Sequence, residues 1–307
     1  MFGSTDSSSE EEARIRLHLL DGEGEETDLE GAQQIISLPA GEEACLQFTV
    51  SVKAPHRWSG EDPYLYTLVL EEESSFDTVY ESAQLGFRKI TYKTTSSGWF
   101  EGTAGDHDLI RINGKPICFR GVDRHETHPE YGYALPEEVM EEDIRIMLEN
   151  NINAVRTSHY PNSPYWYYLC DKYGIYVVDE ANLECHSNMI YENERITQYM
   201  SMSIIDREYN LVRRDQNHAC VVMWSLGNEC KNPEILRSIL VDSYPDPEGI
   251  LRVLHEYTKD RPWHYEQAGD MYETGIDVTF GDELLVLSTC NYHTDNGRFV
   301  VMAKRIK

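Results

Sequence analysis

The sequence predicts two domains, a small antiparallel β-sandwich followed by a parallel sheet built from repeated βα units. The length of 307 residues exceeds that of one ordinary domain. The first part of the chain alternates apolar and polar residues with a period of two, which is typical of strands. From about residue 115 onward, short apolar runs alternate with amphipathic helical stretches, which indicates βα units.

The N-terminal domain is predicted from short alternating segments. Residues 1–12 are rich in Ser and Glu and bury too little apolar surface to offset their ordering entropy, so we expect a disordered tail. Residues 13–95 favour a sandwich, and a Ser-Ser-Gly sequence at 96–98 marks the start of the second domain, 96–307. The alternating apolar positions are Ile15, Leu17 and Leu19, then Leu46, Phe48 and Val50, then Leu85 and Phe87.

The second domain is predicted from its alternation of strands and helices. The predicted strands are 117–122, 152–157, 175–179, 221–226 and a short one at 263–266. The predicted helices are one that starts at Pro136, then 164–173, 196–216 and interrupted helical material at 233–260. Proline favours the first turn of a helix and glycine its end, which fits Pro164 and Gly174. Such units imply a parallel sheet, either open or closed into a barrel.

Composition excludes several classes of function. The 27 Lys and Arg residues against 54 Asp and Glu residues give a net charge of −27, which repels phosphate backbones and anionic lipid heads. We therefore expect no nucleic-acid partner. Because no apolar run approaches a membrane span and the acidic N-terminus lacks a signal-peptide pattern, we predict no membrane contact and a cytoplasmic location. The seven cysteines include no CxxC pair, which argues against a thiolate zinc site.

Polar and titratable residues follow the ends of four successive predicted strands. In a βα barrel that edge of the sheet carries the active site. A single such histidine is usually a hydrogen-bonded loop residue, but four strands with clusters at the same end favour a site. The clusters are Arg124-His125-Glu126, Ser158-His159-Tyr160, Asp179-Glu180 with Glu184-Cys185-His186, and Asn228-Glu229.

Four long motifs in the same order resemble the β-galactosidases of glycoside hydrolase family 2. They are CFRGVDRHETHP at 118–129, NAVRTSHYPN at 153–162, VDEANLECH at 178–186 and WSLGNE at 224–229. Upstream, WSGEDPYLYTL at 58–68 and LGFR at 85–88 resemble the domain that precedes the barrel in that family. The resemblance covers about residues 13–268. It implies an immunoglobulin-like β-sandwich followed by an incomplete (β/α)8 TIM barrel whose sequence diverges after about residue 268.

The resemblance also implies roles for individual residues. Glu229 matches the acid/base of a retaining glycosidase, and Asn228 matches the residue whose amide contacts the sugar hydroxyls. His125 and His159 match the histidines that stabilise the transition state. Glu180 and Arg124 are expected to orient their neighbours, and Trp224 to pack either in the core or at the site.

A magnesium site is implied by the same motifs. Glu184, His186 and Glu229 match the family's Mg²⁺ ligands, and hard oxygen ligands with retained waters suit that ion. Without the resemblance, an ExH triplet is a weak metal signal, because zinc would demand a further His or Cys ligand. Na⁺ binds in the family, but we find no counterpart for its ligands here. Family members oligomerise through other domains, so we carry over no oligomeric state.

The family's nucleophilic Glu has no counterpart in this sequence. Glu266 matches an earlier strand of the family, and Glu283 lies in an unrelated context. A closed barrel needs eight strands, and we predict about five. We therefore expect a truncated family member that hydrolyses β-galactosides slowly or not at all, because loss of a covalent nucleophile costs orders of magnitude in rate.

Three interpretations remain at this point. The first is a retaining β-galactosidase acting on terminal β-D-galactosides, with β-glucuronidase and β-mannosidase activity less favoured by the RHExH and SHYPN motifs. The second is a catalytically inactive fragment that retains a weak sugar or Mg²⁺ site. The third is an interaction protein built on the acidic sandwich.

Overall fold

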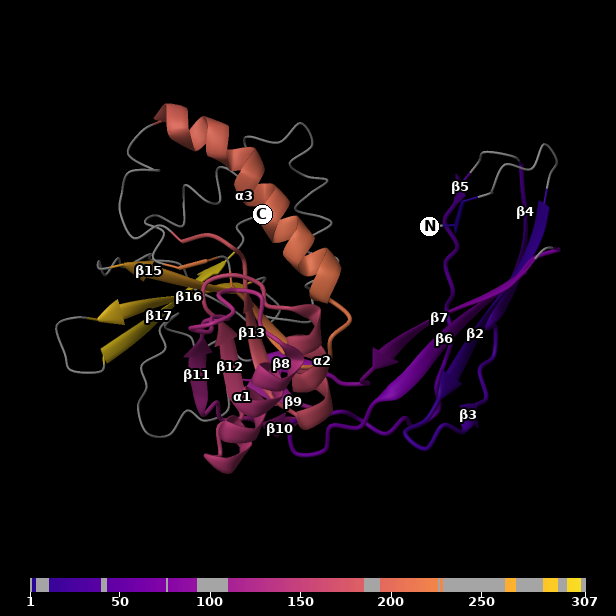
Figure 1. Ribbon diagram of the computed structural model, residues 1–307, viewed down its shortest axis with the longest axis horizontal. Coiled ribbons are helices and arrows are strands. Elements are labelled where there is room, and N and C mark those ends of the chain that lie inside the picture. The colour runs from indigo at the N-terminus through magenta and orange to yellow at the C-terminus, as the bar shows by residue number, and fades with distance from the viewer. Residues whose placement is uncertain are drawn as a thin grey trace. The chain divides into compact units, whose positions relative to one another are not determined.

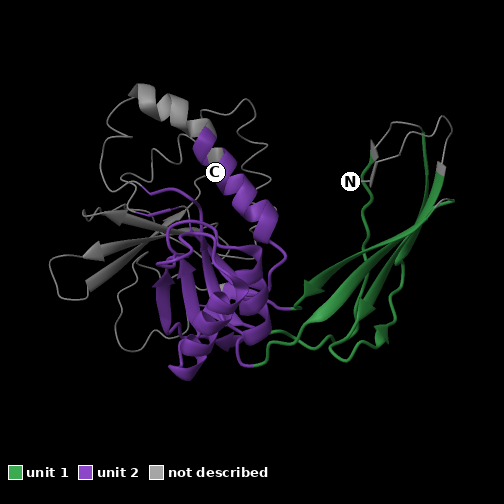
Figure 2. Ribbon diagram, viewed as in Figure 1, with its two compact units in different colours: residues 1–58, 62–87 green, residues 59–61, 88–307 purple. Residues whose placement is uncertain are grey.

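We describe the chain from a computed structural model in which two compact units are formed by residues 1–58 with 62–87 and by 59–61 with 88–307 (Figures 1 and 2). The division falls after residue 87, a few residues before the predicted boundary at residue 95. The structure describes residues 2–3, 11–39, 43–75, 77–92, 110–184, 194–225, 227–228, 263–268, 284–291 and 297–304. Among them, no helix combines the length and the apolar character needed to cross a membrane.

The first unit contains a five-stranded antiparallel sheet. Its strands are β2 (Glu11–Leu20), β3 (Glu26–Thr27), β4 (Gln33–Leu38), β6 (Tyr66–Glu73) and β7 (Thr78–Leu85). The order is β3-β2-β6-β7, and β4 also pairs with β2. A separate pair joins β1 (Phe2–Gly3) to β5 (Glu43–Ala44).

Strand β2 shows the predicted alternation. Ile15 and Leu19 are each 1% exposed on one face of the strand. On the opposite face, Arg14 and Arg16 lie directly across from Glu73 and Glu71 on β6 and form ion pairs with them. Opposite charges at paired positions stabilise antiparallel strands, so both faces of β2 favour this register.

Two predictions for the first unit differ from the structure. Parts of the predicted disordered tail 1–12 are strands, because β1 pairs with β5 and the first two residues of β2 pair with β4 through their backbones. Residues 46–50 alternate between half-buried and exposed as a strand would, but they form no strand. Within the described residues the unit shows one larger sheet and one strand pair, so an immunoglobulin-like sandwich stays a prediction.

The second unit is built on a seven-stranded sheet in sequence order. Its strands are β11 (Gly121–Arg124), β12 (Ala154–Thr157), β13 (Tyr176–Glu180), β14 (Val221–Ser225), β15 (Trp263–Ala268), β16 (Leu284–Asn291) and β17 (Gly297–Lys304). All neighbours are parallel up to β16, and β17 is antiparallel to it. A small antiparallel sheet of β8 (Ile90–Tyr92), β9 (Ile110–Ile112) and β10 (Lys115–Pro116) precedes it.

The helices connect the parallel strands as predicted. They are α1 (Glu137–Glu149), α2 (Pro164–Tyr173) and α3 (Glu194–Asp215). The predicted bounds of α2 are confirmed because Ser163 caps its start by accepting a hydrogen bond from the Tyr165 amide, and Gly174 ends it with φ 74°. Helix α1 buries Met140, Ile144 and Met147, the stripe expected for a helix that covers a sheet.

The edges of the sheet differ from the prediction. Residues 117–120 are not strand, and β11 begins later, because Asn153 occupies backbone groups there. Its side chain accepts from the Arg120 amide and donates to the Cys118 carbonyl, in place of a ladder. Strands β16 and β17 extend the predicted five to seven, and among the described residues β11 and β17 do not pair. The predicted helical material at 233–260 lies outside the described residues.

Candidate active site

The carboxyl ends of four neighbouring strands bring the site residues together. Strand β11 is followed by His125, β12 by His159, β13 by Glu184 and β14 by Asn228. Because the strands are parallel, their carboxyl ends lie at one edge, where Glu180 pairs in register with Ser225. His125, His159, Glu184 and Asn228 therefore lie at the same edge of the sheet as Glu180.

Glu180 is the centre of this cluster. Its side chain is fully buried and accepts hydrogen bonds from Arg156 Nε at 2.5 Å, His159 Nδ1 at 2.7 Å and Ser225 Oγ at 2.7 Å. Burial alone would raise the pKa of Glu180, but the hydrogen bond from His159 and the charge of Arg156 outweigh it and lower the pKa. Glu180 is therefore an ionised carboxylate in a buried position.

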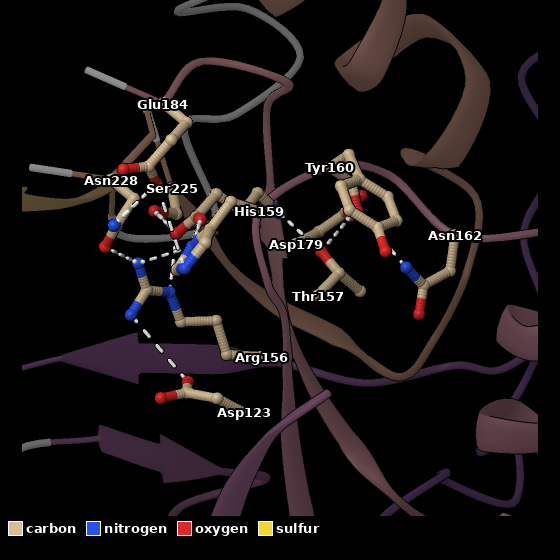
Figure 3. A network of polar contacts seen from close by, with 11 residues as sticks. Asp123, Arg156, Thr157, His159, Tyr160, Asn162, Asp179, Glu184, Ser225 and Asn228 are labelled. Carbon is tan, nitrogen blue, oxygen red and sulfur yellow. Dashed lines mark hydrogen bonds and ion pairs between the residues drawn. The ribbon is translucent and has the colours of Figure 1, made fainter. Parts of the chain in front are cut away.

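Arg156 of β12 connects Glu180 to Asn228, which follows β14, and to Asp123 of β11. Its Nη2 donates to Asn228 Oδ1 at 2.9 Å, and its Nη1 lies 3.7 Å from Asp123 Oδ1 on β11 (Figure 3). The planar guanidinium fixes the direction of each of these contacts. The amide of Asn228 is therefore held with its oxygen toward Arg156 and its nitrogen toward Glu184, to which Nδ2 donates at 2.6 Å.

His159 faces both glutamates of the site. Its Nδ1 contacts Glu180, and its Nε2 lies 3.8 Å from Glu184 Oε2. Burial opposes a charge on the ring, but the hydrogen bond and charge of Glu180 raise the pKa of His159 above its ordinary value. The ring of His125 lies edge-on to that of His159, with centroids 5.3 Å apart, so the two predicted histidines are neighbours.

The segment that carries Asn228 is fixed to the loop after β13. The Asn228 amide donates to the Leu183 carbonyl at 2.8 Å, and Glu184 and Asn228 form an isolated parallel bridge. Gly227 has φ 134°, and a Cβ there would overlap the carbonyl oxygen of Leu183, so only glycine fits this close approach. The predicted residues Glu229 and His186 lie outside the described residues.

Two further predicted residues lie apart from this cluster. Arg124 is buried, contacts Asn162 at 2.7 Å and Asp143 at 3.0 Å, and stacks over the Trp166 ring at 3.8 Å. It orients neighbours on the helix side of the sheet rather than at the glutamates. Trp224 is fully buried in the core.

Sequence reasoning missed Arg156 and the buried acids behind the sheet. Arg156 stands inside an apolar strand, and a buried arginine there is itself a signal, since such charges are rarely buried unpaired. The missed acids are Glu208 and Asp215 of α3, each 1% exposed. Nothing in the helical pattern distinguishes them from solvent-facing acids.

Two parts of this chain match models of a known protein family. Residues 105–293 match the TIM barrel domain of glycosyl hydrolases family 2, and residues 3–88 match a second domain of the same family. The chain belongs to glycoside hydrolase family 2. The family match extends to residue 293, past residue 268, where we expected the sequence to diverge.

Relatives within family 2 are similar over part of their length. A β-galactosidase of Vibrio cholerae is 40% identical over 222 residues, which is 70% of this chain and 20% of that protein. A β-galactosidase of Pseudoalteromonas haloplanktis is 42% identical over 184 residues, 59% of this chain and 16% of that protein. The chain thus spans about a fifth of the length of the curated relatives it matches.

Solved structures share the fold at lower identity. A β-D-glucuronidase from Dictyoglomus thermophilum is 22% identical with a TM-score of 0.61, over 84% of this chain and 40% of that chain. A β-glycosidase from Bacteroides vulgatus is 23% identical with a TM-score of 0.63, over 85% of this chain and 30% of that chain. These likenesses concern the fold alone.

Proposed function

We propose that this chain carries the acid/base half of a retaining β-galactosidase site that hydrolyses terminal β-D-galactosides. The observation that carries the proposal is the pair of hydrogen bonds that Asn228 makes with Arg156 and Glu184. They hold Asn228, the residue before Glu229, beside the Glu184 carboxylate. Identities of about 40% to proteins named β-galactosidase support galactosides as the substrate class.

The proposed mechanism assigns one role to each site residue. Retaining glycosidases use two carboxyl groups about 5 to 5.5 Å apart, one of which donates a proton to the leaving oxygen and later removes one from water. We assign this acid/base role to Glu229. Asn228, whose amide is already oriented by two contacts, holds a sugar hydroxyl, and His125 and His159 donate hydrogen bonds that strengthen in the transition state.

Glu184, His186 and Glu229 are the residues that would hold Mg²⁺. Glu184 suits the ion, because it has a partly exposed carboxylate at the edge of the site and Mg²⁺ prefers oxygen ligands with retained waters. When bound, the ion supplies positive charge that lowers the pKa of groups around it. Asn228 donates to Glu184 Oε2 and thereby orients that carboxylate.

The second carboxyl group, the nucleophile, has no counterpart that we recognise in this sequence. We therefore propose that turnover by this chain is slow or absent, and that sugar or Mg²⁺ binding is its residual property. We also propose that residues 13–95 adopt the immunoglobulin-like arrangement and that β11 to β16 correspond to consecutive strands of a TIM barrel.

Hydrolysis of a chromogenic β-galactoside by the purified chain tests the proposal. The assay is run with and without Mg²⁺, against a Glu229→Gln variant, and repeated with a β-glucuronide and a β-mannoside. Galactoside hydrolysis lost in Glu229→Gln supports the proposed acid/base and means that an unrecognised carboxylate acts as nucleophile. No hydrolysis, with galactose binding detected by calorimetry, supports the inactive form. Preferential hydrolysis of the glucuronide or mannoside contradicts the assignment of substrate.

A further inference from the structure

A groove lies next to Tyr160, beside the candidate active site. It is an open groove of about 680 Å³ between α3 and the loops that follow β11, β12 and β13. Tyr160 separates the two places, because its ring lies 6.2 Å from that of His125 and also lines the groove. Grooves of roughly 300 to 1,000 Å³ are the size that small ligands occupy.

One wall of the groove is aromatic. The Tyr133 side chain is 72% exposed, and its ring packs edge-on against Tyr160 with centroids 5.8 Å apart. Tyr160 is fixed from behind, because its hydroxyl accepts a hydrogen bond from the Glu126 amide at 3.0 Å. An exposed ring on a fixed support offers an apolar surface at low entropic cost.

The opposite wall is polar and has unused hydrogen-bonding groups. Asn182, Asp206 and Asn210 line the groove, and within the described part of the chain their side chains make no hydrogen bond. Amide and carboxylate groups in this state can donate to and accept from hydroxyl groups of a ligand.

The charges that line the groove balance one another. Two acids and two arginines line it, and three of these four have partners, since Arg207 donates to the Asn182 carbonyl within the groove. Glu126 accepts from Arg124 and from the Ser163 amide, and Arg214 forms two bonds to Asp215. The groove therefore lacks the excess of one sign that would select an ion.

We propose that this groove is a second binding site for a neutral saccharide, distinct from the site at the glutamates. A sugar ring has an apolar C–H face for Tyr133 and hydroxyl groups for Asn182 and Asn210 on the facing wall. The inference goes beyond the proposed hydrolysis and holds whether or not the chain turns over galactosides.

Lactose binding to the full chain tests this inference by ligand-observed saturation-transfer NMR. A Glu229→Gln background prevents hydrolysis. Tyr133→Ala removes the exposed ring, Tyr168→Ala removes a matched exposed tyrosine outside the groove, and Asn210→Ala removes one polar group. His159→Ala disables the site at the glutamates. We expect lactose affinity about fivefold weaker in Tyr133→Ala and Asn210→Ala, and retained binding in Tyr168→Ala and His159→Ala.

The outcomes separate the two sites. Lactose binding that is lost only in His159→Ala would contradict the proposed site in the groove but would support the proposed galactoside site. The absence of a lactose signal in the parent chain and in every variant would also contradict the proposed site in the groove. Broadening of the ³¹P signal of inorganic phosphate that disappears in Arg207→Ala, without lactose binding, would show an anion site instead.

Discussion

Asp179 and Glu180 are adjacent residues of β13, both fully buried, yet their carboxyl groups behave in opposite ways. Successive side chains of a strand point to opposite faces, so Glu180 faces the candidate site and Asp179 faces the helix layer. The pKa of Glu180 is lowered, whereas burial and the nearby Asp215 carboxylate raise the pKa of Asp179 well above its ordinary value.

The difference arises from the partners and not from burial. Glu180 meets an arginine, an imidazole and a hydroxyl, all of which stabilise its charge. Asp179 Oδ1 accepts hydrogen bonds from Tyr167 at 2.6 Å and from Thr157 at 3.3 Å, whereas Oδ2 has no donor among the described residues and the Asp215 carboxyl group lies nearby. Burial and the nearby Asp215 charge therefore raise the pKa of Asp179 and favour its neutral form.

Glu208 of α3 is a further buried acid whose pKa is raised. Neither of its carboxylate oxygens has a hydrogen-bond partner among the described residues. Burial, followed by the negative charge of Glu180, raises the pKa of Glu208 well above its ordinary value. The layer at the site thus contains Glu180, whose pKa is lowered, and the layer behind it contains Asp179 and Glu208, whose pKa values are raised.

The largest expected effect is loss of the partner that keeps Glu180 ionised. Arg156→Met leaves that buried charge without its cation, and breaking one side of a buried pair costs about 3 to 5 kcal/mol. Urea unfolding at pH 7 measures the loss. Arg145→Met is the control. It removes exposed ion pairs with two glutamates and should change the urea midpoint of unfolding very little. The double variant Arg156→Met/Glu180→Gln should recover much of the lost unfolding free energy. Equal losses in Arg156→Met and in the double variant would contradict the pairing of Arg156 with Glu180.

The second expected effect is a pH dependence that comes from Glu208. The unfolded chain releases this proton above about pH 4.3, whereas the folded chain keeps it, so stability falls by about 1.4 kcal/mol per pH unit until the folded pKa is reached. Glu208→Gln cannot ionise, and we expect a flatter slope between pH 5 and 7 and greater stability at pH 7. Asp206→Asn, an exposed acid on the same helix, should leave the slope unchanged. An unchanged slope in Glu208→Gln would show that this acid is ionised in the folded chain.

The contrast between the two layers could be predicted only in part from sequence. Period-two alternation predicts that Asp179 and Glu180 face opposite ways, and the apolar runs predict β12, β13 and β14 nearly to their ends. The partners could not be predicted, because Arg156 and Glu180 are 24 residues apart and meet only through the register of parallel strands. Glu208 could not be distinguished either, since a 3.6-residue pattern gives the face of a helix but not what covers it.

The third expected effect is loss of the donor to Asp179. Tyr167→Phe removes a buried hydroxyl that donates to Asp179 and accepts from the Asn162 amide at 3.1 Å. Leaving buried groups unsatisfied costs about 1 to 3 kcal/mol. Tyr165→Phe removes a hydroxyl that donates to exposed Glu141 and serves as the control in the same urea titration. Equal midpoints for the two variants would mean that Asp179 finds another donor.

The smallest expected effect concerns Thr157, whose hydroxyl contacts the carboxyl group of Asp179 and the backbone of Glu180. It accepts from the Glu180 amide at 2.8 Å and donates to Asp179 Oδ1 at 3.3 Å. Thr157→Ser keeps the hydroxyl and loses one buried methyl group, so we expect a cost of about 0.8 kcal/mol in unfolding free energy. Thr157→Val keeps the shape but removes the hydroxyl, and should cost more. If the two variants were equally stable, the hydroxyl would not connect the layers, and the opposite states of Asp179 and Glu180 would depend on their outer partners alone.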